Sequence, residues 1–450
     1  MAKIFALLFA LATVTYAEPA PDFDWIMQAG GPKNDKTRCI CTDAKGNVFI
    51  AGEFAGESKW GSSTITSAGE LDFFVAKLDP AGKVLWVRTG GGSKIDRGYG
   101  VACDKAGNCY VTGHYQSDDC KFDGHPLTLT GGYDIFVGKY GPDGKLEWIT
   151  SAGGEGYDYG HGIMVSDQGD VFVTGAVVGE AAFGSEKLPN DKVSHVFCAC
   201  YSTGGALKWV KAAQGKGSSS GHGVNVDGAG NAYVGGFCGG IATLGGTALS
   251  NPKGSDILIA KFSPTGEVAW VQQGHGSPHA MIHEMAVDKE GRVFASGMYK
   301  DELHPEEGKV VANRGDNDLL LTCIDPSGKR LWTITGGGPK TDYGLGVVAD
   351  GKGGCLLTGE ISDTAEILGQ SLTSHGATDI YVASIDGMGK LRWITQAGGP
   401  ASDSAYTIAM DPQGNAFFSG SFSGTAVFGS HTLVSAGGGD VYVAKLKAAR

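Results

Sequence analysis

Three histidines recur at a fixed interval in this 450-residue chain and are the residues best suited to chemistry. His161, His222 and His283 are each 61 residues apart, and Glu284 follows the last of them. Imidazole and carboxylate groups commonly serve as general acids, bases and metal ligands. An interval of 61 residues exceeds any local motif, so the histidines come from successive copies of a structural repeat.

Other copies of the repeat place different side chains at this position, namely Arg38, Tyr99, Leu345 and Tyr406. The fifth copy departs most from the others, because its connections are rich in histidine and acidic residues. We therefore expect a binding site at the mouth of the innermost strands. Its candidate residues are Arg38, Tyr99, His161, His222, His283, Glu284, Tyr406, His279, Glu302 and His304.

Three roles for these side chains remain open: packing against the next repeat, contact with a non-metal ligand, and a metal or acid–base site. Packed sheets lie about 10 Å apart, whereas Zn–N bonds measure about 2.0–2.1 Å. The three imidazoles could share one ion only if all of them turned toward a common axis. We therefore predict neither a metal nor a cofactor.

Tryptophans mark the repeat along the whole chain. The gaps between them are 61 or 62 residues, and each tryptophan precedes a pair of small or glycine residues. The seven positions are Trp25, Trp86, Trp148, Trp209, Trp270, Trp332 and Trp393. Such regularity is typical of a repeat architecture, in which each unit buries its apolar surface against its neighbours.

One unit, residues 99–153, contains four short segments rich in β-forming residues, separated by turn sequences such as Gly141-Pro142-Asp143-Gly144. Four antiparallel strands per unit predict the blade of a β-propeller. First-to-third strands occur seven times, and the fourth strand of the last unit is missing. The segment Asp24–Met27 supplies a tryptophan strand at the other terminus. We predict an all-β, seven-bladed propeller closed by this N-terminal strand.

The repeated phrases resemble a known family. The run from Tyr406 to Asp411, continued by Gly414 to Gly420, and the run from Asp440 to Lys445 are similar to the SBBP-type seven-bladed β-propeller repeat. The resemblance covers nearly all of residues 18–450 and implies the fold. Members of that family are mostly exported or surface proteins of bacteria, and the resemblance implies no single activity and no catalytic motif.

Several other repeated residues are interpreted as scaffold. Aspartates open the third strand in six units and precede the first strand in five, which is typical of side chains that hold turns. The Gly-x-Gly pairs, such as Gly98 and Gly100, lack the third glycine and the following helix of a dinucleotide-binding fingerprint.

Composition limits the partners and suggests a destination. The net charge of -12 argues against a nucleic-acid partner. Residues 1–17 combine one lysine, a short apolar run and a small-residue site ending at Ala17, which predicts a signal peptide. No later segment is long and apolar enough to span a membrane. We expect residues 18–450 to form one propeller domain, monomeric, and secreted, periplasmic or at the cell surface.

The ten cysteines show no zinc-binding spacing. Cys103 and Cys109 flank one hairpin turn and could bridge across it. Most of the others occupy apolar positions of the repeat, which favours buried free thiols.

Two functions are the main alternatives after these exclusions, beside a third one, a purely structural surface component. The leading hypothesis is a non-catalytic binding or scaffold propeller that recognises a protein or a glycan through its variable loop face. The alternative is a hydrolase or lyase that uses the histidines and the acidic residues of the fifth repeat. The sequence contains no recognisable nucleophile–base pair, paired carboxylates or phosphate loop, so we favour the first.

Overall fold

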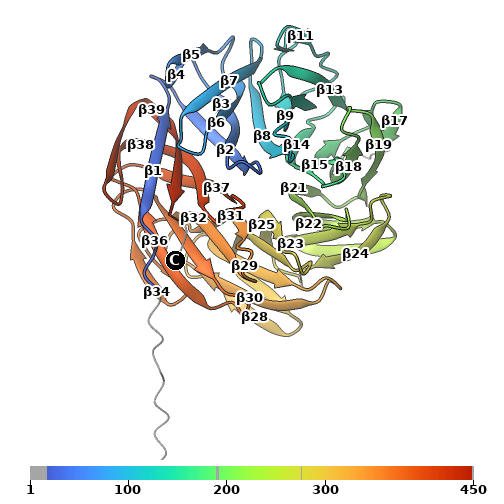
Figure 1. Cartoon of the computed structure of the whole chain (residues 1–450). Helices are drawn as coiled ribbons and strands as arrows, with labels where there is room; N and C mark the ends of the chain where they lie inside the picture. Colours follow the sequence, from blue (N-terminus) through green and yellow to red (C-terminus); the bar gives the residue numbers. More distant parts are fainter. Residues whose placement is uncertain (1–17, 189–191, 275, 448–450) are drawn as a thin grey trace, which may run out of the picture.

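The computed structural model describes residues 18–188, 192–274 and 276–447. Within these ranges the secondary structure consists of strands and turns, with no helix. Antiparallel sheets stand around a common centre, in the order of the chain (Figure 1). The prediction of an all-β propeller is therefore confirmed.

Each sheet is a meander of four strands, from the centre outward. The innermost strands are β2 (Asp35–Thr42), β8 (Asp96–Cys103), β14 (Tyr159–Val165), β21 (Ser219–Val226), β25 (His279–Val287), β31 (Tyr343–Ala349) and β37 (Asp403–Met410). The second strands are β3 (Val48–Phe54), β9 (Cys109–Tyr115), β15 (Val171–Val178), β22 (Ala232–Leu244), β26 (Val293–Lys300), β32 (Cys355–Ile361) and β38 (Ala416–Phe428). The third strands are β6 (Asp72–Leu78), β12 (Asp134–Tyr140), β18 (Ser194–Tyr201), β23 (Thr247–Phe262), β29 (Asp318–Ile324), β35 (Asp379–Ile385) and β39 (His431–Leu446). The outer strands are β7 (Val84–Gly91), β13 (Leu146–Gly154), β19 (Leu207–Ala212), β24 (Val268–Gln273), β30 (Arg330–Gly336), β36 (Leu391–Ala397) and β1 (Phe23–Ala29).

The two ends of the described chain meet in one sheet. Strand β1 pairs antiparallel with β39, with Ile26 opposite Ala444 and Ala29 opposite Val441. The two strands lie side by side at the blue and red ends of the colour scale (Figure 1). This pairing agrees with the prediction that the N-terminal tryptophan strand completes the last set.

The connections between second and third strands differ from the expectation of a plain polar loop. Most contain a small hairpin, and several of these hairpins bond to the outer strand of the preceding sheet, as β10 does to β7 and β16 to β13. The additional short strands are β4 (Glu57–Trp60), β5 (Ser63–Thr66), β10 (Lys121–Phe122), β11 (His125–Pro126), β16 (Ala181–Phe183), β17 (Glu186–Leu188), β20 (Gln214–Gly215), β27 (Glu302–Glu306), β28 (Lys309–Ala312), β33 (Thr364–Ile367) and β34 (Gln370–Thr373). Their sequences are too short and polar for periodicity to identify them.

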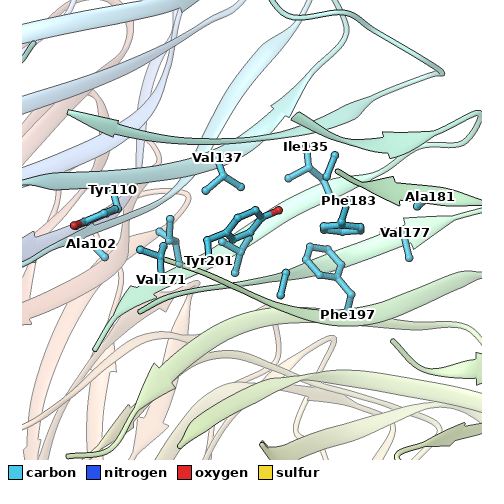
Figure 2. Packing of buried hydrophobic residues seen from close by; sticks show 14 of the residues in the cluster. Ala102, Tyr110, Ile135, Val137, Val171, Val177, Ala181, Phe183, Phe197 and Tyr201 are labelled. Atoms are coloured by element: carbon cyan, nitrogen blue, oxygen red, sulfur yellow. The ribbon is translucent and has the colours of Figure 1, made fainter. Parts of the chain in front are cut away.

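The core is divided among the spaces between neighbouring sheets. Strands such as β3, β9 and β12 are buried at every residue because both faces of each sheet are covered. Between the second and third sheets, Val137 and Tyr110 pack toward Val171, Phe197 and Tyr201 (Figure 2). Each sheet is thus stabilised by its neighbours, as expected for a repeat protein.

The tryptophans link consecutive sheets through one repeated contact. Six of the seven repeat tryptophans donate a hydrogen bond from the indole Nε1 to a turn carbonyl of the following sheet, as from Trp86 to Pro142 O (3.1 Å) and from Trp148 to Thr203 O (3.0 Å). A turn glycine lies against the indole ring, so that a Cβ added to Gly144 would be 2.8 Å from Trp86. The other donating tryptophans are Trp25, Trp209, Trp270 and Trp332.

The interpretation of the repeated aspartates as scaffold is also confirmed. Asp96 accepts hydrogen bonds from the backbone N–H groups of Gly92 (2.8 Å) and Gln116 (2.9 Å). Asp158 accepts from Gly154 and Val178 at the matching place. Such buried carboxylates satisfy backbone donors where the chain enters five of the seven innermost strands.

Two predictions concern the signal peptide and membrane-spanning segments. The signal peptide predicted for residues 1–17 lies outside the described residues. No helix in the described part of the chain is long and apolar enough to cross a membrane.

The tryptophan–glycine contact predicts a stability difference between two matched variants. Gly144 and Gly124 both have left-handed backbones, with φ of 80° and 81°, but Gly124 has no atom within 4 Å of an added Cβ. Both alanine variants incur the left-handed backbone cost of about 1–2 kcal/mol. We expect Gly144→Ala to lose about 1–3 kcal/mol more, because the methyl group must displace Trp86. Urea unfolding checks this, and equal losses would contradict the contact.

Candidate functional site

The innermost strands surround a pocket of about 470 Å³ at the centre of the propeller. Seven of the ten predicted site residues line this pocket. They are Arg38, Tyr99, His161, His222, His283, Glu284 and Tyr406. These residues come from the innermost strands of six sheets, so only the tertiary arrangement of the sheets brings them together.

A β-bulge in each innermost strand directs these side chains. The ladder between β8 and β9 shifts between Gly98 and Gly100, so that Tyr99 lies outside the regular pairing. The same shift occurs around His161 in β14 and around His222 in β21. A bulged residue is freed from strict alternation and can be re-aimed. The repeated bulge therefore presents one side chain per strand to the pocket.

The Gly-x-Gly pairs have a steric cause at this bulge. A Cβ added to Gly98 would lie 2.4 Å from the Phe73 ring, and one added to Gly100 would lie 2.8 Å from His161 O. At this bulge the neighbouring residues approach so closely that no side chain fits at Gly98 or at Gly100. This steric role agrees with the interpretation of the Gly-x-Gly pairs as part of the scaffold.

The planar side chains form a continuous arc around the pocket. The Arg38 guanidinium lies 5.0 Å from the Tyr99 ring centroid, and Tyr99 lies 4.7 Å from His161. His161 stacks on His222 at 4.8 Å with 20° between the planes, and His222 meets His283 at 5.9 Å. The residues therefore share one pocket and also stack on each other.

Arg38 is held in place by a buried carboxylate that the sequence did not identify. Its Nη2 and Nε atoms donate to Glu53, with the shorter distance 2.6 Å. Tyr406 lies on the other side of the guanidinium, 5.8 Å away. A bidentate ion pair fixes the plane of the guanidinium, which leaves its stacking faces available to the neighbouring rings.

Burial keeps the imidazoles neutral. It lowers the pKa of His161 and of His283 to about 4 from the ordinary 6.5, and it lowers the pKa of His222 well below that value. Repulsion by the Arg38 charge adds to the effect at His161. The three imidazoles of the arc therefore present uncharged donors and acceptors at neutral pH.

Glu284 occupies a place where four other innermost strands have glycine. Its Oε1 accepts a hydrogen bond from the backbone N–H of Met285 at 2.9 Å. Burial raises the pKa of the carboxyl to about 7 from the ordinary 4.5, and the Met285 bond opposes the rise. Glu284 is thus a carboxyl group that titrates near neutral pH inside the pocket.

The arrangement of donor groups does not resemble a metal centre. Among the described residues, no group of three or more histidine, cysteine, aspartate or glutamate side chains is placed to hold a metal ion. The three histidines stack face to face or edge to face instead of pointing to a common point.

The remaining predicted residues, His279, Glu302 and His304, do not line the pocket. His279 begins β25 and its Nδ1 lies 3.1 Å from Asp301. Glu302 and His304 belong to the small hairpin strand β27 and lie 2.9 Å from each other. The sequence suggested a common site because the three follow one another in the fifth repeat, but the hairpin lies away from the pocket.

Sulfur atoms form a part of the pocket wall that the sequence analysis missed. Cys39, Cys41 and Cys103 line it together with three methionines. The methionines are Met164, Met285 and Met410. All ten cysteines are unbridged, including Cys103 and Cys109, which stand opposite each other in the β8–β9 ladder. The cysteines occupy different positions in different repeats, so the sequence offered no sign that three of them would line one pocket.

Comparison with known proteins gives a limited result. No family model matches the chain. A curated relative, the uncharacterized WD repeat-containing protein L264 of Acanthamoeba polyphaga mimivirus, is 21% identical over 464 residues, which cover 89% of this chain and 31% of the relative. The chain thus spans about a third of that relative's length. The similarity supports a propeller built from sequence repeats.

The solved structures that align with this chain are proteins of different kinds. The WD40 propeller domain of Doa1 matches 93% of this chain and 97% of its own, with a TM-score of 0.47 and 11% identity. A puromycin hydrolase matches 88% and 51%, with a TM-score of 0.43 and 13% identity. A gluconolactonase from Xanthomonas campestris matches 96% and 99%, with a TM-score of 0.37 and 11% identity. Propeller frames support many unrelated activities, so none passes to this chain by fold alone.

The lowered pKa of His283 predicts a pH-dependent contribution to stability. Because the folded pKa of about 4 lies below 6.5, this contribution is present above pH 6.5 and is lost as the pH falls toward 4. We expect His283→Phe to reduce by about 1–3 kcal/mol the loss of unfolding free energy between pH 7 and pH 4.5. The exposed His279, changed to Phe, is the control. Parallel curves for His283→Phe and the wild type would contradict the assignment.

Glu284 predicts the opposite dependence. Its folded pKa of about 7 lies above 4.5, so the stability that it contributes is present below pH 4.5 and is lost as the pH rises through 7. Glu284→Gln should therefore be more stable than the wild type at pH 8, by about 1–3 kcal/mol, and equal to it at pH 4.5. Denaturant unfolding at both pH values measures this, with Glu57→Gln on an exposed position as the control.

Proposed function

We propose that this chain is a non-catalytic binding or scaffold propeller, which recognises a protein or a glycan at the mouth of its central pocket. The observation that carries the proposal is the arc of stacked planar side chains from Arg38 through Tyr99 to the three histidines. Tyrosine and arginine are enriched in the energetically important parts of interfaces. Neutral imidazoles add hydrogen-bonding groups without the desolvation cost of a charge.

The repeat architecture supports the same proposal. The relative from mimivirus is described as a WD repeat-containing protein, and a propeller of this kind suits a protein-binding scaffold. The described sheets are tightly linked to one another, whereas the pocket remains open at the centre. A rigid frame around a variable central surface is a common basis of recognition.

We propose further that the propeller has seven blades of the SBBP type and that residues 18–450 form one domain. The sevenfold recurrence of the bulged inner strand and the pairing of β1 with β39 support this count and a closed ring. We also propose that residues 1–17 direct export, so that the protein works as a monomer in the secreted fraction, the periplasm or at the cell surface.

A hydrolase or lyase is the second candidate function, and one observation favours it. Glu284 has a pKa near 7 and lines the same pocket as three neutral imidazoles. A carboxyl group whose pKa lies near the working pH is suited to general acid–base catalysis. In this case Glu284 would transfer the proton, and a neutral histidine of the arc would hold the substrate.

Binding screens with matched variants test the proposal. The purified chain is applied to a glycan array and used to capture proteins from extracts, alongside Tyr99→Ala and His222→Ala. We expect each variant to weaken binding of a hit about tenfold or more, which corresponds to about 1.4 kcal/mol for each factor of ten. His279→Ala, which lies outside the pocket, should bind as the wild type does.

The screens also separate the two functions. A hit that the arc variants bind as tightly as the wild type would contradict recognition at the pocket. Turnover of a glycoside, ester or lactone library that disappears in Glu284→Gln would instead favour the catalytic function.

A further inference from the structure

Four of the ten cysteines gather at one place, the space between the first and second sheets. Cys39 and Cys41 lie on the innermost strand β2, Cys103 ends β8, and Cys109 begins β9. All four pack in the same apolar cluster, together with Val101. Because these positions belong to different phases of the repeat, the grouping is not a consequence of the repeat itself.

The thiols of Cys41 and Cys103 face each other across this space. Cys39 Sγ lies 3.6 Å from Val101 O, so this side of β2 is directed toward β8. Cys41 follows Cys39 by two residues and points to the same side, and Cys103 follows Val101 in the same way. Both side chains therefore pack in the cluster between the first and second sheets, and both line the central pocket.

Cys41 and Cys109 are the two possible disulfide partners of Cys103, and they differ in their access to solvent. Cys41 and Cys103 are partly exposed and line the central pocket. Cys109 stands opposite Cys103 in the β8–β9 ladder but is completely buried and does not line the pocket. A dissolved disulfide can therefore reach the first pair through the pocket, whereas the Cys109 thiol is covered.

We propose that Cys41 and Cys103 are an oxidation site that forms a disulfide between the first and second sheets at the wall of the pocket. The oxidant is a small soluble disulfide of the glutathione type. One cysteine, as its thiolate, attacks the oxidant and forms a mixed disulfide, releasing one small thiol. The second thiolate attacks the cysteine sulfur of that mixed disulfide and releases the second small thiol. Two protein thiols are oxidised and one external disulfide is reduced to two thiols.

The bond would join two sheets that are otherwise held by packing and hydrogen bonds. It would close the loop from residue 41 to residue 103, and a cross-link over a loop of this length restricts the unfolded chain strongly. The oxidised protein should therefore unfold at a higher temperature than the reduced protein, and reduction should reverse the shift. This site is independent of the proposed binding function, since it needs no ligand.

Tryptic mapping of the full chain can identify the bond. The reduced protein is incubated with oxidised glutathione, its remaining thiols are alkylated, and it is digested without reductant. Cleavage places Cys39 and Cys41 in peptide 39–45, Cys103 in peptide 98–105, and Cys109 in peptide 106–121. We expect peptides 39–45 and 98–105 to be linked, with a mass lower by two hydrogens than the sum of the two free peptides.

Cysteine variants identify which two residues form the disulfide bond. The link should persist in Cys39→Ser and Cys109→Ser and disappear in Cys41→Ala. Alanine occupies the position of Cys41 in other repeats, at Ala102 and Ala409, so we expect this variant to fold, and circular dichroism checks it. A link between peptides 98–105 and 106–121, glutathione adducts alone, or unlinked peptides would each overturn the proposal. Loss of the link in Cys39→Ser but not in Cys41→Ala would overturn the assignment to Cys41.

Discussion

The structure depends on a contact that six of the seven repeat tryptophans make with a turn of the following sheet. The indole donates a hydrogen bond to a turn carbonyl, and a glycine with a left-handed backbone lies against its ring, as Gly144 does on Trp86. No sheet of this protein has a core of its own, since the second and third strands are covered on both faces only by neighbouring sheets. The repeated contact sets the spacing and orientation of the sheets, and the spacing in turn determines what can lie at the centre.

At the centre, close approach of the inner strands creates both the pocket and its chemistry. In the second sheet the inner strand lies so near its neighbours that only glycine fits on both sides of the bulged Tyr99, at Gly98 and Gly100. The bulge then directs one large side chain per strand toward the axis, where the neighbouring side chains cover it. Burial without a nearby opposite charge explains why the pKa of His283 falls and the pKa of Glu284 rises. The same constraint that assembles the frame therefore sets the electrostatics of the site.

The pocket combines groups of different character around one space. Stacked rings and a fixed guanidinium occupy one part of the wall, and sulfur atoms from cysteine and methionine occupy another. The first part is suited to recognition, and the thiols of the second are chemically reactive groups close to it. A bond between Cys41 and Cys103 would stiffen the wall next to Arg38 and Tyr99, which lie on the same two strands.

The sequence by itself determined the repeat, the order of the strands and the position of the variable side chain in each innermost strand, because tryptophan, glycine and aspartate recur wherever the same contact recurs. It therefore identified Arg38, Tyr99 and the three histidines as members of one surface. Only the tertiary structure decided that His279, Glu302 and His304 lie outside the pocket, since residues close together in the chain need not lie close together around the centre of the propeller. It also decided that Glu53 holds Arg38 and that Cys41 and Cys103 share one cluster at the wall of the pocket. These contacts join different strands and sheets through residues that occur only once, and no periodic signal can reveal them.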